Sequence, residues 1–123
     1  MQPEGDLPVN PDPLVLASVR SVRGHIIRLT YRQWVHITES HDYMIGNRDK
    51  VLETVADPDR LVAGDHGATI ALRHYATTTV AEKTCVTIYR DEENGFTITA
   101  FLTSRPDKIV RKGETLWQRP LST

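Results

Sequence analysis

The spacing of apolar residues changes near residue 61, and this change constrains the fold more than any other feature of the chain. Before it, Trp34 and Ile37 recur at helical spacing, and so do Val51 and Val55. After it, apolar and polar residues alternate, as in strands with one buried face. The pattern predicts two helices followed by antiparallel strands. The helices are expected over residues 31–40 and 48–55, and the strands over residues 69–75, 85–89 and 96–103.

Two β-rich runs, residues 14–19 and 24–30, precede the helices and predict a hairpin. Thr30 and Asn47 are the expected N-caps of the two helices. The predicted fold is therefore an α+β domain, in which an N-terminal β-hairpin and two helices pack on an antiparallel sheet of about four strands. A proline-rich leader over residues 1–13, a single domain over residues 14–119 and a tail over residues 120–123 complete the expected organisation.

Composition excludes several classes of protein. Among 123 residues, 39% are hydrophobic and 25% charged, as in ordinary globular proteins. No apolar run approaches the roughly 20 residues that span a bilayer, and the N-terminus does not resemble a signal peptide. A cytoplasmic protein without a membrane partner is expected. Cys85 is the only cysteine, and no motif for zinc, calcium or a nucleotide cofactor is present, so neither a metal nor a cofactor is expected.

Charge is unevenly distributed, although the net charge is −1. Residues 18–33 contain four arginines and no acid, and residues 105–119 contain five basic and two acidic residues. Residues 39–65 contain seven acidic and three basic residues. Positive segments of this kind can meet phosphate groups, so a nucleic acid is an expected partner. A solvated surface of mixed charge is the alternative interpretation.

The alternation in the strands predicts which side chains share a face. If the larger apolar residues point to the helices, an arginine, two tyrosines and several threonines point away from them and could converge on a phosphate. The expected polar face contains Arg73, Tyr75, Thr87, Tyr89, Thr97, Thr99 and Thr103. The expected core between helices and sheet contains Trp34, Ile37, Val51, Leu52, Val55, Ile70, Leu72, Val86, Ile88, Ile98 and Leu102.

Histidines supply the candidates for proton transfer, because an unperturbed imidazole titrates near pH 6.5. His36 and His41 are about 140° apart on a helix, so one unbroken helix cannot aim both at one ligand. His36 lies off the apolar stripe and is the better candidate for contact with substrate. His41 has a structural or a catalytic role near the helix end. His74 is read as a core or edge residue, and His25 and His66 show no convincing partners in the sequence.

Five motifs follow one another over residues 25–117. They are Arg28-Leu-Thr-Tyr-Arg-Gln-Trp-Val-His-Ile followed by His41, Val51-Leu-Glu-Thr-Val before Asp57-Pro-Asp59, Arg73-x-Tyr75, Phe96-x-Ile-Thr-Ala-Phe-x-Thr-Ser104 and Gly113-x-x-Leu-Trp117. In this order they resemble small phage- and prokaryote-associated proteins that are grouped with the barnase–EndoU–colicin–RelE-like (BECR) nucleases. A proline that often follows the second histidine in that group is Asp42 here.

The resemblance implies the BECR fold, with an active site on the open face of the sheet, and RNA cleavage without a metal. Attack of the 2′-OH on the adjacent phosphate would give a 2′,3′-cyclic phosphate, as in a toxin or mobile-element effector. An antitoxin or immunity protein is then an expected second partner beside RNA. The alternative is a catalytically inactive module of the same fold that binds RNA or protein. The expected catalytic residues are His36, His41, Arg73 and Thr99, and the expected substrate-binding residues are Tyr75, Thr97, Thr103 and Arg32.

Overall fold

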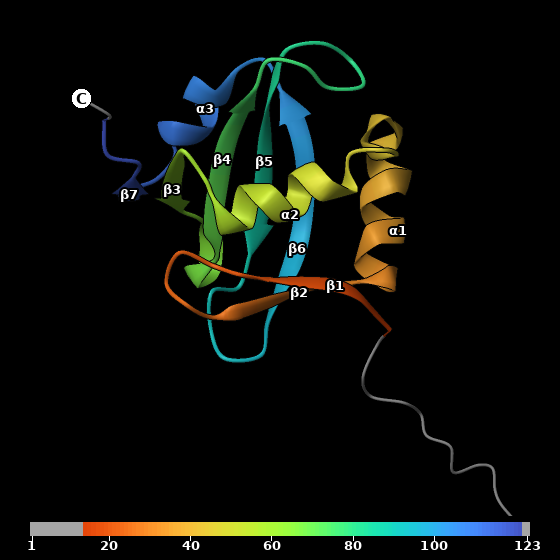
Figure 1. Ribbon diagram of the computed structural model, residues 1–123. Helices are drawn as coiled ribbons and strands as arrows, with labels where there is room; N and C mark the ends of the chain where they lie inside the picture. Colours follow the sequence, from red (N-terminus) through yellow and green to blue (C-terminus); the bar gives the residue numbers. More distant parts are fainter. Residues whose placement is uncertain (1–13, 122–123) are drawn as a thin grey trace, which may run out of the picture.

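The computed structural model describes residues 14–121, and the expected leader and the last two residues of the tail lie outside this range. Within it, seven strands form one sheet, and three helices pack around that sheet (Figure 1). The elements in chain order are β1 (Val15–Arg20), β2 (Ile26–Thr30), α1 (Tyr31–Ser40), the 3₁₀ turn η2 (Asp42–Met44), α2 (Arg48–Ala56), β3 (Arg60–Ala63), the 3₁₀ turn η3 (Asp65–Gly67), β4 (Thr69–Tyr75), β5 (Lys83–Tyr89), β6 (Gly95–Thr103), α3 (Pro106–Val110) and β7 (Thr115–Gln118).

The strands are ordered β1-β2-β6-β5-β4-β3-β7 across the sheet. Neighbouring strands are antiparallel except for β2 and β6, which are parallel. This is an α+β arrangement, but the predicted sheet of about four strands with two helices is wrong. β3 and β7 have four residues each and α3 has five, so all three are too short for a hydrophobic period to reveal them.

A short parallel junction attaches the β1–β2 hairpin to the rest of the sheet. It consists of two residue pairs, Ile27 with Gly95 and Arg28 with Phe96. A Cβ atom at Gly95 would lie 2.6 Å from Cδ1 of Ile27, so the absence of a side chain lets the two strands approach. The paired residues are far apart in the sequence, and no local pattern indicates their contact. The sequence therefore predicts the hairpin but not its place in the sheet.

Both longer helices lie close to their predicted ranges. α1 begins after Thr30, whose hydroxyl accepts a hydrogen bond from the backbone N–H of Gln33 at 3.2 Å, so the predicted N-cap is confirmed. The Asn47 side chain makes no capping bond to α2. Its amide donates instead to the Tyr43 carbonyl and to the Thr79 hydroxyl, so Asn47 occupies the predicted N-cap position but its side chain does not cap the helix. Because α1 follows β2 without a loop, its direction is fixed by the hairpin.

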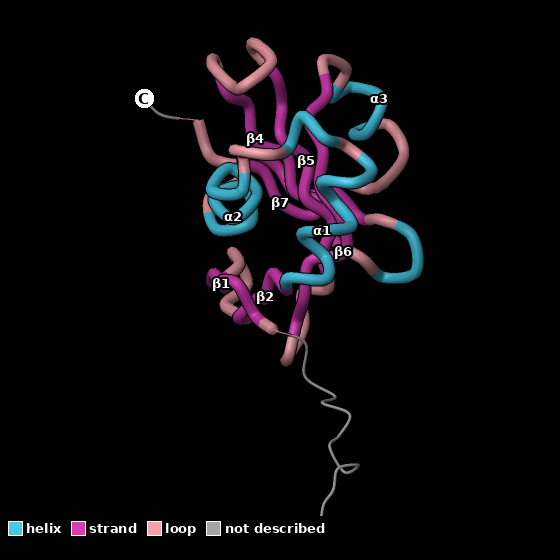
Figure 2. Tube along the Cα trace, turned by 90° about the vertical axis from the view of Figure 1, so that its right-hand side faces the viewer, coloured by secondary structure: helices cyan, strands magenta, loops and turns pink. Residues whose placement is uncertain are grey.

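The sheet has helices on both sides, with α2 and α3 on opposite sides of the strands (Figure 2). We call the side that packs against α1 and α2 the helix face, and the other side the open face. Small residues of β5 lie against α2: the thiol of Cys85 is 3.8 Å from the Lys50 carbonyl, and the hydroxyl of Thr87 donates to the Val51 carbonyl at 3.2 Å. Small side chains let the backbone of α2 lie close to the sheet.

The predicted core is right for the helices and wrong for most of the strand residues. Ile37 and Val51 are buried on the helix face as predicted, but Leu72 and Val86 pack on the open face with Val110 of α3 and its neighbours. The prediction assumed that only one face is apolar, whereas this sheet buries apolar residues on both. Trp34, Leu52, Val55 and Leu102 also lie with the helix-face clusters, and Ile70, Ile88 and Ile98 belong to the open face.

Candidate functional site

Arg73 and Tyr75 lie on the helix face of the sheet. Their side chains contact α2 and its C-terminal end and do not point to the open face. Arg73 Nη1 donates to the backbone carbonyl of Asp57 at 2.6 Å and to its carboxylate at 3.1 Å, and Arg73 Nε is 3.6 Å from the Glu53 carboxylate. The Tyr75 hydroxyl donates to Glu53 at 2.6 Å, and burial with this hydrogen bond raises the pKa of Tyr75. The guanidinium of Arg73 is therefore already engaged by acidic and carbonyl oxygens of this chain.

Asp57 is held between two arginines at the end of α2. Arg119 Nη2 donates to its carboxylate at 2.7 Å, and this hydrogen bond, followed by the charges of Arg119 and Arg73, lowers the pKa of Asp57 from 3.8. A carboxyl whose pKa is lower in the folded than in the unfolded state stabilises the fold at pH values above its ordinary pKa. This contribution is lost as the pH falls through the lowered pKa of the folded state. The ion pairs are largely solvent-exposed, so their contribution is small.

Replacing Asp57 by asparagine should therefore lower the free energy of unfolding at pH 7 by about 0.5–1 kcal/mol, the upper part of the range for exposed pairs. The difference in the free energy of unfolding between parent and variant should shrink as the pH is lowered below 4, because Asp57 of the parent becomes protonated and is then as neutral as asparagine. Urea unfolding at pH 7, 5 and 3 measures this difference. A difference that stays constant over the three pH values would mean that charge is not the cause.

The three predicted threonines do not share one face. Thr97 lies opposite Tyr89 and is buried on the helix face, whereas Thr99 lies opposite Ile88 on the open face. The register shifts between these two pairs, so one extra residue of β6 reverses the alternation. The prediction that Arg73, Tyr75 and Thr99 lie on a common face is therefore wrong. Thr103 follows the same parity as Thr99, whereas Thr87 and Tyr89 belong to the helix face.

The two histidines of α1 and its end also diverge. His36 is exposed, in a shallow hollow of α1 that Arg32 and Tyr31 also line. His41 follows the last residue of α1, and its ring centroid lies 5.6 Å from that of Tyr43 and 5.8 Å from that of Phe101. The predicted catalytic residues are thus spread over the outer surface of α1, the helix face and β6. Their roles in catalysis stay predictions.

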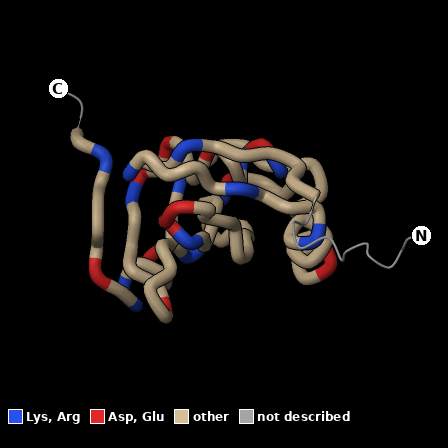
Figure 3. The backbone as a smooth tube through the Cα atoms, turned by 90° about the horizontal axis from the view of Figure 1, so that it is seen from below, with Lys and Arg blue, Asp and Glu red and all other residues tan. Residues whose placement is uncertain are grey.

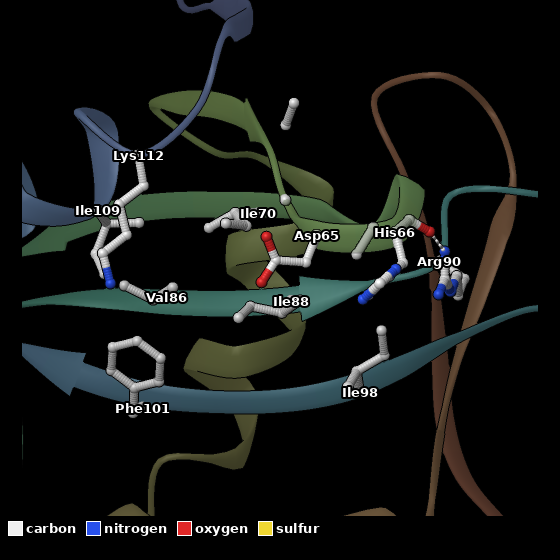
Figure 4. Close-up of a pocket in the computed structure, with 13 residues that line it drawn as sticks. Asp65, His66, Ile70, Val86, Ile88, Arg90, Ile98, Phe101, Ile109 and Lys112 are labelled. Atoms are coloured by element: carbon white, nitrogen blue, oxygen red, sulfur yellow. Dashed lines mark hydrogen bonds between the residues drawn. The ribbon is translucent and has the colours of Figure 1, made fainter.

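A hollow of about 510 Å³ lies on the open face, and we call it the open-face pocket. Figure 4 shows apolar side chains of β4, β5 and β6 as its floor, with polar side chains from η3 and from the segment after α3 above them. Concave sites with an apolar floor and a few polar groups are typical of ligand-binding sites. The floor includes Ile70, Val86, Ile88, Ile98 and Phe101, and the polar residues are Asp65, His66, Arg90 and Lys112.

The polar side chains of the open-face pocket come from different parts of the chain. The Asp65 carboxylate projects over Ile88, the His66 ring lies beside it, and Lys112 reaches down from the opposite side (Figure 4). The guanidinium of Arg90 donates to the backbone carbonyl of His66, which ties η3 to the end of β5. Within residues 14–121, none of these four side chains forms an ion pair. Their charges are therefore available to a ligand.

His66 has a left-handed backbone conformation, with φ +56° and ψ +34°. Among residues other than glycine this conformation is uncommon, but histidine adopts it more often than most, typically in tight turns. Gly67 follows with φ +81°, and the Ala68 N–H donates to the Asp65 carbonyl at 3.1 Å, which closes the turn. The turn thus fixes the direction of the His66 side chain above the floor.

Sequence reasoning missed this site because η3 has no hydrophobic period and its partners are distant in the chain. The Asp-His pair enclosed by Gly64 and Gly67 was the available signal, since glycines on both sides indicate a tight turn that presents the residues between them. Arg90 and Lys112 carry no local signal, because only the order of the strands brings them near η3. Two predicted residues lie next to the lining of the pocket: the His41 ring is 5.8 Å from that of Phe101, and Thr99 is paired with Ile88 on the open face.

A second histidine–carboxylate pair joins the β1–β2 turn to the β5–β6 turn. His25 Nδ1 lies 2.9 Å from the buried carboxylate of Asp91, and the Ser21 hydroxyl donates to the same oxygen at 2.7 Å. The Ser21 hydroxyl also accepts a hydrogen bond from the backbone N–H of His25 at 3.2 Å, but it makes no bond to the imidazole, so the three residues do not form a nucleophilic triad. We interpret this cluster as a structural contact that holds the hairpin to the rest of the sheet. The sequence showed no convincing partner for His25, and in the structure that partner is Asp91.

Within residues 14–121, no three histidine, cysteine or acidic side chains come together in a manner suited to a metal ion. In the same part of the chain, every helix is too short or too polar to traverse a bilayer.

Burial raises the pKa of the Cys85 thiol, which lies inside the sheet–helix interface. An imidazole, a carboxylate and a cationic side chain also line the hollow of α1 (His36, Glu39, Arg32) and a hollow beside Thr103 (His74, Glu82, Lys83), but the open-face pocket adds a floor of apolar strand residues. No protein-family model, curated protein or solved structure matches this chain.

Proposed function

We propose that this protein is a metal-independent ribonuclease that acts on single-stranded RNA in the open-face pocket. One observation carries the proposal: an imidazole, a carboxylate and two basic side chains surround an accessible apolar floor that includes an aromatic ring. An imidazole near neutral pH can accept and donate protons, and cationic side chains stabilise the charge that develops on a phosphate under attack. The resemblance of the motif order to the BECR nucleases supports the same reaction class, and kinship with them is part of the proposal.

In the proposed reaction each polar residue of the pocket has a role. His66 and Asp65 form the acid–base pair, which takes the proton from the RNA 2′-OH and returns one to the leaving 5′ oxygen. Arg90 and Lys112 hold the phosphate from two sides of the pocket and stabilise the phosphorane. A base can stack on Phe101, because aromatic side chains bind unpaired bases through their faces. The bond formed is between the 2′ oxygen and phosphorus, and the bond broken is between phosphorus and the 5′ oxygen.

A second candidate is a binding module that uses the same pocket without catalysis. It is favoured by the observation that the residues marked by the resemblance are dispersed, with Arg73 occupied by Asp57 and Glu53. An active enzyme would act on RNA in the cytoplasm, and a toxin of this kind would require a protein inhibitor in its own cell. These two points belong to the proposal and depend on activity.

The test is incubation of the purified protein with a fluorescent 12-nucleotide single-stranded RNA in the presence of EDTA. We expect cleavage with products that end in a 2′,3′-cyclic phosphate, detected by mass spectrometry. A matched oligonucleotide with 2′-deoxy sugars should stay intact, because the attacking hydroxyl is missing. Binding without cleavage would support the second candidate instead. Cleavage of the deoxy oligonucleotide would contradict the mechanism even if RNA were also degraded.

A further inference from the structure

A second hollow lies where α1 meets the hairpin. It has a volume of about 250 Å³ and is lined by Arg28, Thr30, Arg32, Gln33 and Phe96, and we call it the hairpin groove. Phe96 is 37% exposed, although it is a large apolar residue of β6 that is paired with Arg28 of β2. An exposed ring in a groove beside two arginines is a combination that binds bases and phosphates. The groove has no part in the reaction described above.

The hairpin groove adjoins the open-face pocket along β6. Phe96 lines the groove and Ile98 lines the pocket, and the two residues are separated by one position of the same strand. Two residues of a strand span roughly 7 Å. Thr97 between them is buried on the helix face, whereas Phe96 lines the groove beside Arg28 and Ile98 lines the floor of the open-face pocket. A ligand that extends beyond the pocket along β6 therefore reaches the groove.

The arginines of the groove keep their positive charge free for a ligand. Arg28 donates to the backbone carbonyls of Asn94 at 3.0 Å and Gly95 at 3.3 Å, which orient the guanidinium without neutralising it. Neither Arg28 nor Arg32 forms an ion pair within the described part of the chain. Figure 3 views the protein from the hairpin end and shows basic positions along the hairpin strands. Glu39 lines the neighbouring hollow of α1 together with Arg32, and Glu92 and Glu93 precede Asn94 in the β5–β6 turn.

We propose that the hairpin groove binds the RNA nucleotide that flanks the one in the open-face pocket. Phe96 stacks on its base, and Arg28 and Arg32 bind its phosphate. This inference rests on the proposed function, because the pocket supplies the first nucleotide. RNA is favoured over a protein partner because the groove continues the open-face pocket along β6 and places one exposed ring beside two guanidiniums without an ion pair among the described residues, which matches a base and its phosphate.

The experiment measures binding separately from cleavage. A 12-nucleotide RNA with 2′-O-methyl sugars has no nucleophile, and its affinity is measured by fluorescence anisotropy over a range of salt concentrations. Phe96→Ala should weaken binding about 10-fold or more, the scale of one lost stacking contact. Phe96→Tyr keeps a ring and should restore binding. Arg32→Gln should lower the slope of log affinity against log salt by about 0.7, the value for one phosphate on a single strand.

Arg48→Gln is the matched control, because Arg48 is an exposed arginine at the start of α2, away from both hollows. Its salt slope and affinity should equal those of the parent. Parent-like binding by Phe96→Ala and Arg32→Gln would overturn the inference, and so would equal competition by poly-glutamate and unlabelled RNA, which shows a non-selective anion site. If the parent binds the methylated RNA through these residues but leaves ordinary RNA intact, the groove stands and the ribonuclease proposal fails.

Discussion

Replacing His66 by asparagine should lower kcat/KM for single-stranded RNA in EDTA by about 100-fold or more, the range attributed to one acid or base. Asparagine tolerates the left-handed backbone conformation of this position, so η3 should keep its shape. The substitution removes the proton-transferring ring and leaves the floor of the pocket intact. The pH dependence of kcat/KM should also lose one of its two limbs, because one titrating group is gone.

The control for this substitution is His74→Asn, which makes the same chemical change at an exposed histidine that pairs with Glu82 at 2.7 Å. It should stay within about twofold of the parent. His36→Ala distinguishes the two locations of the acid–base group. A large loss in folded His36→Ala together with full activity in His66→Asn would move the reaction to the surface of α1 and contradict the open-face pocket. Circular dichroism of each variant shows whether the fold is retained.

Replacing Ile37 by alanine should lower the free energy of unfolding by about 2–5 kcal/mol, because a fully buried side chain is lost and a cavity is left. Ile37 lies on α1 in the cluster that joins this helix to Leu29 and Leu102. Alanine favours helix, so the loss comes from packing and not from the backbone. Thermal and urea unfolding measure the change.

The same substitution at Ile45 is the matched control, since Ile45 is 66% exposed after η2. Its effect should stay within about 0.5 kcal/mol. Equal effects at the two positions would contradict the placement of α1 on the sheet. A large change in the dependence of unfolding on urea would indicate an altered unfolded state or a loss of two-state behaviour.

Local patterns predicted the elements that depend on local interactions. The helical period located α1 and α2 to within about a residue, and the Thr30 cap marked where α1 begins. The alternation located β4 and β6 to within one residue, and β5 begins two residues before its predicted start. What the sequence did not reveal depends on partners that are distant in the chain. The pairing of β2 with β6 and the addition of β3 and β7 to the sheet are of this kind.

The predicted faces of the strand residues were wrong for two physical reasons. The larger apolar residues of β4 and β5 were taken to face the helices, but the small residues Cys85 and Thr87 do so, because α2 lies close to the sheet. The register shift in β6 then separated Thr97 from Thr99, which simple alternation places together. Arg73 was predicted to be free to bind a phosphate. In the structure its guanidinium forms an ion pair with Asp57. Burial on both faces of a sheet removes the signal on which such face assignments depend.

The two-residue junction between β2 and β6 also governs the order in which the chain can become stable during synthesis. A ribosome releases the hairpin, α1 and α2 long before residues 95 and 96 emerge. Until then, Leu29 and Ile37 lack the Ala100 and Leu102 surface on which they are buried. The apolar residues of the N-terminal half therefore stay exposed until the C-terminal half has been synthesised. The chain then completes its fold, after translation of β6, as one cooperative unit.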